Sequence, residues 1–180
     1  MPAIKPAEIR HAAGPGDMAH ARALFIEYAK WLNVDLCFQG FDVELAGLPG
    51  AYAPPYGRLL LTGPLEAPFG CIALRPLAAK GDAAPDDTSR GAPVCGEVKR
   101  LYVQPAHRHG GHGVALAERL VSEARAIGYR ELKLDTFDWM TAARALYARL
   151  GFRESTAYYE NPYPGVVYMS CTLEGTSATA

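Results

Sequence analysis

Residues 97–125 constrain the fold of this chain more than any other stretch, because three local patterns follow one another there. Residues 97–103 contain the β-branched and aromatic side chains that are typical of a strand. Pro105 ends that strand, because proline has no amide hydrogen to donate to a sheet. Apolar side chains then recur at helical spacing from Val114 to Ala124. The stretch therefore predicts a strand, a glycine-rich turn and a helix, in that order.

The turn between this strand and helix, residues 104–113, has the features of an anion-binding site. The first amides of a helix have no partner within the helix, and the helix dipole adds partial positive charge there. Glycine lets the backbone approach a ligand closely, and Arg108 adds a full positive charge. Such a turn suits a pyrophosphate. The alternative is a strand-to-helix turn that needs flexible residues and binds no ligand.

Two short motifs narrow the range of folds and functions. One is Arg-x-x-Gly-x-Gly at residues 108–113, and the other is Leu-Tyr-x-x-x-Gly-Phe at residues 146–152. The glycines do not fit the register of the dinucleotide-binding Gly-x-Gly-x-x-Gly, and no Gly-Lys-Ser/Thr follows as in a P-loop. The first motif resembles the acyl-CoA-binding signature of the GNAT N-acetyltransferase superfamily, and the second resembles another segment of the same superfamily. Their order and separation support this resemblance.

Length and composition predict one globular domain over residues 1–180. Hydrophobic residues make up 49% of the chain and charged residues 21%, as in ordinary globular proteins. The net charge of -1 provides no general attraction for nucleic acid. There is no signal-peptide pattern, and no apolar run approaches the roughly 20 residues that span a bilayer. We therefore expect a cytoplasmic protein without nucleic-acid or membrane partners. The four cysteines form no Cys-x-x-Cys pair, so we expect no metal.

Hydrophobic periodicity predicts alternating strands and helices along the chain. Strands are predicted at residues 8–12, 58–62, 69–74, 97–103, 131–136, 152–159 and 166–173. Helices are predicted at residues 18–32, 41–46, 114–125 and 141–150, with a turn at 14–16 before the first and caps at Asp17 and Thr141. A mobile loop is predicted at 78–92 and a polar tail at 174–180.

This order of elements predicts an α+β fold. A mixed, mostly antiparallel sheet of about six or seven strands is expected, with helices on both of its faces. The GNAT fold has the same architecture, so the resemblance covers most of the chain.

The resemblance implies an acetyl-CoA-dependent N-acetyltransferase in which a primary amine attacks the thioester directly. Tyr147 stands where many members carry the general acid that protonates the leaving thiolate, and a phenol is protonated at neutral pH. Glu97 stands where several members carry the base that takes a proton from the amine. Alternatively, Tyr147 packs on the core, and Glu97 pairs with Lys99, two residues further along the strand.

The resemblance also implies where the coenzyme binds. Backbone amides at the end of the central strand receive the pantetheine arm and polarise the acyl carbonyl, while the turn receives the pyrophosphate. The three histidines of the turn are interpreted as exposed loop residues, because a metal cation there would oppose the helix dipole. Met140 replaces an asparagine that contacts the coenzyme in many relatives, so that contact is not expected here, and Thr141 is a weak substitute. The implied coenzyme-binding residues are Leu101, Tyr102, Val103, Arg108, His109, Gly110, Gly111, His112, Gly113 and Val114.

The acceptor is less constrained by the sequence. Acidic side chains in the region that faces acceptors in this fold are expected to bind an ammonium group, and aromatic side chains suit a small amine or a cation held against ring faces. We expect a small-molecule amine and a monomer or homodimer. The predicted substrate-binding residues are Asp35, Phe38, Glu44 and Tyr158, with further wall candidates at Phe41, Tyr52, Tyr56, Tyr159 and Tyr163.

Other functions remain open at this point. A non-catalytic acyl-CoA sensor or interaction module could share the fold, but it needs neither Tyr147 nor Glu97. A protein N-acetyltransferase is a further alternative, although the chain lacks the acidic runs that suit a polycation. A dinucleotide-dependent oxidoreductase is disfavoured by the register of the glycines.

Overall fold

The computed structural model describes residues 8–77 and 94–173 of the chain. The predicted loop at 78–92 and the predicted tail at 174–180 lie outside the described residues. None of the helices in these two ranges has the length and apolar character that a bilayer span requires.

The described chain forms two compact units. The first unit consists of residues 8–75 and 99–121, and the second of residues 76–77, 94–98 and 122–173. The division passes through strand β4 (Cys95–Val103) and helix α3 (His112–Ile127), so each unit contains part of both elements. The single domain predicted over residues 1–180 stays a prediction.

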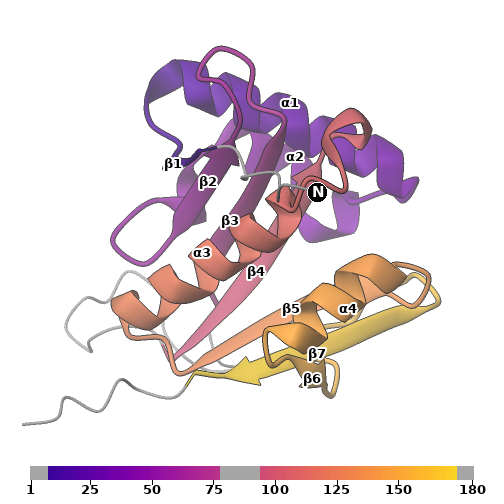
Figure 1. Cartoon of the computed structure of the whole chain (residues 1–180). Coiled ribbons are helices and arrows are strands. Elements are labelled where there is room, and N and C mark those ends of the chain that lie inside the picture. The colour runs from indigo at the N-terminus through magenta and orange to yellow at the C-terminus, as the bar shows by residue number, and fades with distance from the viewer. Residues whose placement is uncertain (1–7, 78–93, 174–180) are drawn as a thin grey trace, which may run out of the picture. The chain divides into compact units, whose positions relative to one another are not determined.

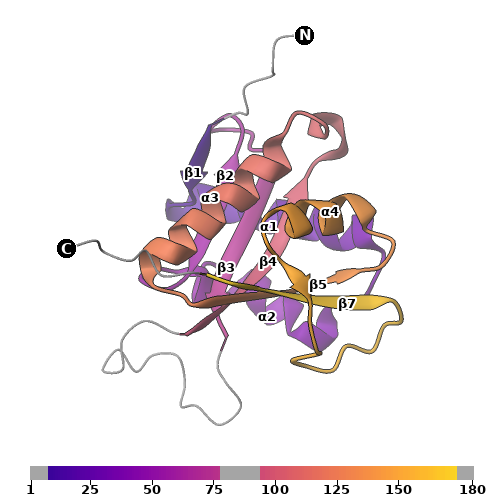
Figure 2. The same ribbon diagram turned by 60° about the horizontal axis from the view of Figure 1, so that its bottom comes forward.

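The first unit contains antiparallel strands and two helices that precede β4. Its elements before β4 are β1 (Ile9–His11), α1 (Gly14–Leu32), α2 (Phe41–Ala46), β2 (Arg58–Thr62) and β3 (Gly70–Pro76), with 3₁₀ turns at Cys37–Gln39 and Gly50–Tyr52. Leu60 of β2 pairs with His11 on one side and with Ile72 on the other. Figures 1 and 2 show α1 and α2 behind these strands and α3 in front of them.

The core of the first unit explains why these segments fold as they do. Ala21, Leu24 and Phe25 recur on one side of α1 and are buried, as are Leu116 and Leu120 on α3. β2 is apolar and buried along almost its whole length, as a strand covered on both faces must be. Each fully buried leucine or phenylalanine contributes roughly 1.5–3 kcal/mol of transfer free energy. The apolar residues that recur at helical spacing in the sequence are therefore the residues that α1 and α3 bury against the sheet.

The second unit contains the remaining strands and the last helix. Its elements after β4 and α3 are β5 (Glu131–Phe137), α4 (Thr141–Arg149), β6 (Arg153–Glu154) and β7 (Val166–Thr172). β4 and β5 run parallel, with Glu97 opposite Lys133, whereas β5 and β6 each pair antiparallel with β7. α4 lies beside β5 and β7 (Figure 1).

The strands follow the order β1-β2-β3-β4-β5-β7-β6 in a seven-stranded sheet. The pairs β1–β2, β2–β3, β5–β7 and β6–β7 are antiparallel, and the parallel pair β4–β5 lies near the middle of that order. This confirms the predicted α+β fold with a mixed, mostly antiparallel sheet.

The start of α1 differs from the prediction. The helix begins at Gly14, so the turn predicted at 14–16 is wrong. Pro15 fits the first turn of a helix because the amide hydrogen that it lacks would have no partner there. Asp17 accepts a hydrogen bond from the amide of Ala13 at 2.8 Å and pairs with Arg10 at 2.6 Å. Asp17 therefore secures the helix start from inside its first turn.

Two further boundaries differ in the second unit. The N-cap of α4 is Met140, so Thr141 is the first helical residue and not the predicted cap. β6 covers Arg153–Glu154, whereas a strand was expected over residues 152–159. The later part of that range, including Tyr158 and Tyr159, follows the paired residues as a connecting segment. These tyrosines pack on one another, as described below, and do not continue the ladder.

A left-handed backbone conformation interrupts β4 at Arg100. Its φ of 58° costs a non-glycine residue about 1–3 kcal/mol. The side chain is 3% exposed and forms a bidentate pair with Glu44, in which Nε lies 2.9 Å from Oε1 and Nη2 lies 2.7 Å from Oε2. The Cys71 thiol donates to the Arg100 carbonyl at 3.3 Å. A left-handed residue within a strand bends the strand locally, as in a β-bulge. This bend in β4 is held through both the side chain and the carbonyl of Arg100.

Replacing Glu44 by alanine should destabilise the protein by about 3–5 kcal/mol, because the substitution leaves the buried guanidinium of Arg100 without its carboxylate. Urea denaturation of Glu44→Ala and wild type measures this. Glu154→Ala is the matched control, since the Arg144–Glu154 pair has the same 2.7 Å distance but lies 33% and 66% exposed. The control should lose at most about 1 kcal/mol. Equal losses in the two variants would show that the Arg100–Glu44 pair does not anchor β4.

Candidate active site

The turn after β4 leads directly into the start of α3. A 3₁₀ turn at Pro105–His107 is followed by left-handed residues at His109 and Gly111, with φ of 66° and 77°. The Gly111 carbonyl accepts the amide of Ala115 at 3.0 Å, which closes the first turn of α3. The preceding amides at such a helix start point outward along the helix axis. The predicted turn and the helix after it are therefore both present, and the helix has 16 residues. Binding of an anion by the turn stays a prediction.

Arg108 is fixed against the end of β4. Its Nε donates to the Val103 carbonyl at 3.0 Å. Its guanidinium carbon lies 4.6 Å from the ring centroid of Trp31 and 5.8 Å from that of Tyr102. The charge predicted for the turn is thus held in place by one hydrogen bond and two ring faces.

The three histidines of the turn have different surroundings. His107 and His109 are exposed, as predicted, but His107 also stacks on Phe69 with centroids 4.0 Å apart. His112 is half-buried and meets the same phenylalanine edge-on at 4.9 Å. Within residues 8–77 and 94–173, no group of three or more His, Cys, Asp or Glu side chains is arranged to hold a metal ion.

The predicted pantetheine-binding strand, Leu101 to Val103, follows the bend at Arg100. The paired register of β4 with β5 extends from Cys95 opposite Glu131 to Glu97 opposite Lys133, and β4 then continues to Val103. On β3, a side chain at Gly70 would come within 3.1 Å of the Tyr102 carbonyl. Glycine at this position therefore lets β3 approach the end of β4 closely.

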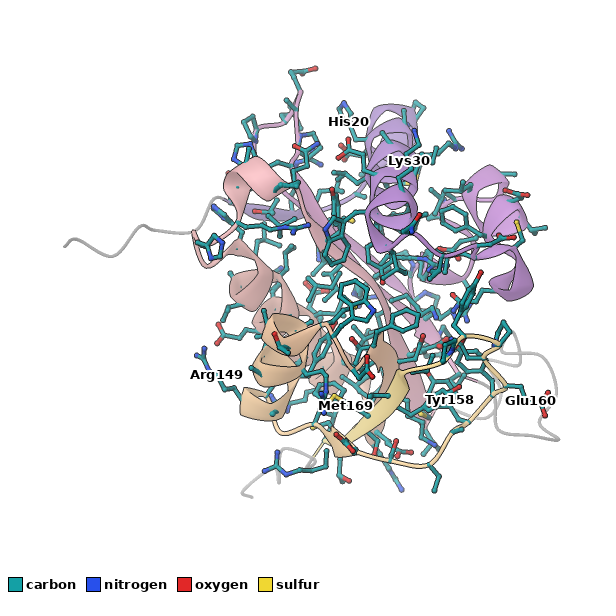
Figure 3. All side chains as sticks on the ribbon, turned by 90° about the vertical axis from the view of Figure 1, so that its right-hand side faces the viewer. His20, Lys30, Arg149, Tyr158, Glu160 and Met169 are labelled. Carbon is teal, nitrogen blue, oxygen red and sulfur yellow. The ribbon has the colours of Figure 1, made fainter. Side chains whose placement is uncertain are left out.

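Glu97 and Tyr158 are brought together in the second unit. Glu97 lies on β4 and is 1% exposed. Tyr158 lies on the segment between β6 and β7, where Figure 3 labels it, and Glu160 points outward further along that segment. The Tyr158 hydroxyl donates to Glu97 Oε1 at 2.9 Å. The predicted base and one predicted substrate-binding residue are therefore direct partners.

Tyr158 belongs to a cluster of three half-buried tyrosines, Tyr158, Tyr159 and Tyr168, which we call the tyrosine cluster. Their rings meet edge-on, with centroids 5.2, 5.4 and 5.6 Å apart. Burial, Glu97 and Asp135 raise the pKa of Tyr158, and burial and Asp135 raise that of Tyr159. These hydroxyls therefore stay protonated at neutral pH. The ammonium of Lys133 lies 5.9 Å from the Tyr158 ring centroid.

Tyr147, the predicted acid, lies on α4 in the second unit. It is 8% exposed, and its ring centroid lies 5.6 Å from that of Phe152. The position that departs from the superfamily pattern, Met140, accepts a hydrogen bond from the Thr136 hydroxyl at 3.5 Å through its sulfur. Tyr147 therefore packs in the core, and its acid role stays a prediction.

The acidic residues predicted to bind the acceptor have local partners in the first unit. Asp35 is exposed, and its Oδ1 accepts the amide of Cys37 at 2.8 Å, as in a turn cap. Both oxygens of Glu44 are used by Arg100, and Oε1 also accepts the Tyr52 hydroxyl at 2.9 Å. These contacts favour structural roles for both carboxylates.

The side chain of Phe38 lies outside what the structure describes, so its predicted role stays a prediction.

Three residues near the predicted site residues were not anticipated from the sequence. Arg100, Asp135 and Tyr168 were not assigned any role. The sequence did contain one signal for Arg100. Glu97, Lys99 and Arg100 lie in the central strand of a sheet that was expected to have helices on both faces, and buried charged side chains need buried partners.

Comparisons with known proteins agree with this architecture. A model of the "Acetyltransferase (GNAT) family" matches residues 51–152. An uncharacterised N-acetyltransferase of Schizosaccharomyces pombe is 36% identical over 92% of this chain and 96% of its own length. An acyl-CoA N-acyltransferase structure from Klebsiella pneumoniae is 27% identical, with a TM-score of 0.66 over 93% of this chain and 97% of that one. The acetyltransferase yncA of Salmonella typhimurium, solved with its cofactor acetyl-CoA, shares the fold with a TM-score of 0.62 and 21% identity over 98% and 99% of the two chains.

Tyr158 should not ionise in the range where ordinary tyrosines do, because burial, Glu97 and Asp135 raise its pKa above 10.0. Alkaline titration of the phenolate absorbance compares wild type with Tyr158→Phe. The folded proteins should give equal amplitudes near pH 10, whereas in denaturant wild type should show one additional tyrosine. A folded variant that lacks one tyrosine of amplitude near pH 10 would contradict the buried contact with Glu97.

Proposed function

Because the chain belongs to the GNAT acetyltransferase family and is an acyltransferase, we propose that it transfers an acetyl group from acetyl-CoA to the primary amine of a small molecule. The observation that carries this proposal is the glycine turn at the start of α3, with Arg108 fixed beside it. This arrangement suits the pyrophosphate of a coenzyme A ester. The residues present fit that co-substrate, because a left-handed glycine, outward amides and a fixed cation occur together.

The proposed coenzyme site uses the turn for the pyrophosphate and the end of β4 for the pantetheine arm. The amides of the turn and of the first residues of α3 would donate to the phosphate oxygens, and the guanidinium of Arg108 would balance their charge. The strand segment Leu101 to Val103 would supply backbone groups to the amides of the pantetheine arm. The bend at Arg100 supports this assignment, since it separates this segment from the part of β4 that pairs with β5.

The proposed chemistry is direct acyl transfer. The acceptor nitrogen loses a proton and attacks the thioester carbonyl, and the tetrahedral intermediate then collapses with loss of the coenzyme A thiolate. Glu97 takes the proton from the acceptor, and Tyr147 gives a proton to the thiolate. Burial of both side chains supports these roles, because removal from water strengthens their interactions with a charged intermediate.

The proposed acceptor is a small, cationic amine. The carboxylates of Glu97 and Asp135 beside Tyr158 support this proposal, because negative charges attract an ammonium group. Acidic runs that would attract a basic protein tail do not occur in the sequence. A cytoplasmic location and a monomeric or homodimeric state remain predictions from the sequence.

Replacing Tyr147 by phenylalanine should lower kcat by about 10²–10⁴-fold, because the thiolate then leaves without a proton donor. The dissociation constant for acetyl-CoA should stay unchanged, since the hydroxyl acts only when the thiolate leaves. Release of free thiol with a panel of primary amines gives kcat, and calorimetry gives the dissociation constant.

Tyr129→Phe is the matched control, because Tyr129 is also a buried tyrosine of the second unit. It should retain wild-type turnover. Wild-type kcat in Tyr147→Phe would remove Tyr147 as the acid. Binding of acetyl-CoA without thiol release for any amine would replace the enzyme by a coenzyme sensor, and no binding at all would overturn the assignment of the glycine turn.

A further inference from the structure

We propose that Tyr158 is a catalytic proton relay through which the buried carboxylate of Glu97 deprotonates the acceptor. This inference rests on the proposed function, in which an amine arrives as its ammonium form. It assigns Tyr158 to the reaction itself, in place of the general substrate-binding role predicted from the sequence.

The burial of Glu97 motivates the relay. The Glu97 side chain is 1% exposed, whereas Tyr158 is half-buried and donates to Glu97 Oε1 at 2.9 Å. Tyr158 is thus the more exposed of the two partners. General bases act over hydrogen-bond distances, either directly or through one intervening group such as a water. The phenol oxygen occupies the position of that intervening group.

The relay balances in protons and charge. One N–H bond of the ammonium breaks as its proton moves to the Tyr158 oxygen. In the same step the original O–H bond of Tyr158 breaks, and that proton moves to Glu97 Oε1. The acceptor becomes a neutral amine with a free electron pair, Glu97 becomes a neutral carboxylic acid, and Tyr158 ends as a phenol. No phenolate accumulates, which is consistent with the raised pKa of Tyr158.

Charged and titratable groups surround the proposed relay. Asp135 acts on the phenol as a second negative charge beside Glu97, and both raise the pKa of Tyr158 after burial itself. Lys133 lies opposite Glu97 in the sheet register, with Nζ 5.9 Å from the Tyr158 ring centroid. The other titratable neighbours are Cys95 and Lys99 along β4, Tyr159 on the connecting segment and Tyr168 on β7.

Tyr158 is distinguished from the other two members of the tyrosine cluster by its partner. The Tyr159 hydroxyl accepts from Asn161 Nδ2 at 3.1 Å, and the Tyr168 hydroxyl donates to the Tyr159 carbonyl at 2.9 Å. Their rings contact Tyr158 at similar distances. Phenylalanine at position 168 therefore removes a hydroxyl from the same cluster while leaving the bond between Tyr158 and Glu97 in place.

The test compares two acceptors of similar size but different basicity, one fully protonated at neutral pH and one uncharged there. Tyr158→Phe should lower kcat/KM for the basic amine by at least about 100-fold, because its ammonium proton has no path to Glu97. For the weakly basic amine the same variant should lose less than about tenfold, because no proton must be removed before attack. Glu97→Gln should show the same contrast, and the double variant should be no slower than either single variant. Tyr168→Phe should behave as wild type with both amines.

Each outcome decides between the relay and a structural role. Wild-type kcat/KM in Tyr158→Phe with the basic amine, while Glu97→Gln is slow, would overturn the relay and leave Glu97 as the base. Equal losses with both amines in Tyr158→Phe would also overturn it, because misplaced packing does not depend on amine basicity. Wild-type activity of Glu97→Gln with the basic amine would overturn the base assigned under the proposed function.

Discussion

The buried ion pair between Arg100 and Glu44 is the interaction on which the geometry of the central strand depends. A left-handed arginine in mid-strand has an unfavourable backbone conformation, and an arginine side chain that is only 3% exposed has lost most of its hydration. Both oxygens of Glu44 and the thiol of Cys71 offset these costs at one point in β4. The strand therefore bends at a fixed position, with Glu97 before the bend and the segment leading to the glycine turn after it.

The residues proposed for coenzyme binding and for proton transfer belong to different units. The first contains the glycine turn and Arg108, which suit the charged end of a coenzyme A ester. The second contains Tyr147, Glu97 and Tyr158, which suit proton transfer. β4 runs through both units, so one continuous strand carries the base and leads to the coenzyme turn. Membership of the GNAT acetyltransferase family supports an acyltransferase reaction.

Local patterns in the sequence predicted the elements, and long-range contacts decided what the polar residues do. The spacing of Gly111 and Gly113 after a strand sufficed to predict the turn, because a strand-to-helix turn is local. By contrast, Arg100 and Glu44 are separated by 56 residues, and Tyr158 and Glu97 by 61. The spacing of apolar residues along the sequence carries no information about contacts between such distant residues. The strand predicted over 152–159 failed for a related reason, since its later tyrosines pack on one another instead of extending the ladder. Glu44 has the charge for an ammonium ligand, but its oxygens are already engaged.

The most direct test of the account is to incubate the protein with acetyl-CoA and small primary amines and to measure both products in one sample by mass spectrometry. The account predicts that coenzyme A thiol and N-acetylated amine appear in equal amounts with one class of cationic small amine. Acetylation confined to protein amino groups would contradict the proposed acceptor. Bound acetyl-CoA that yields neither product with any amine would contradict the proposed transfer reaction itself.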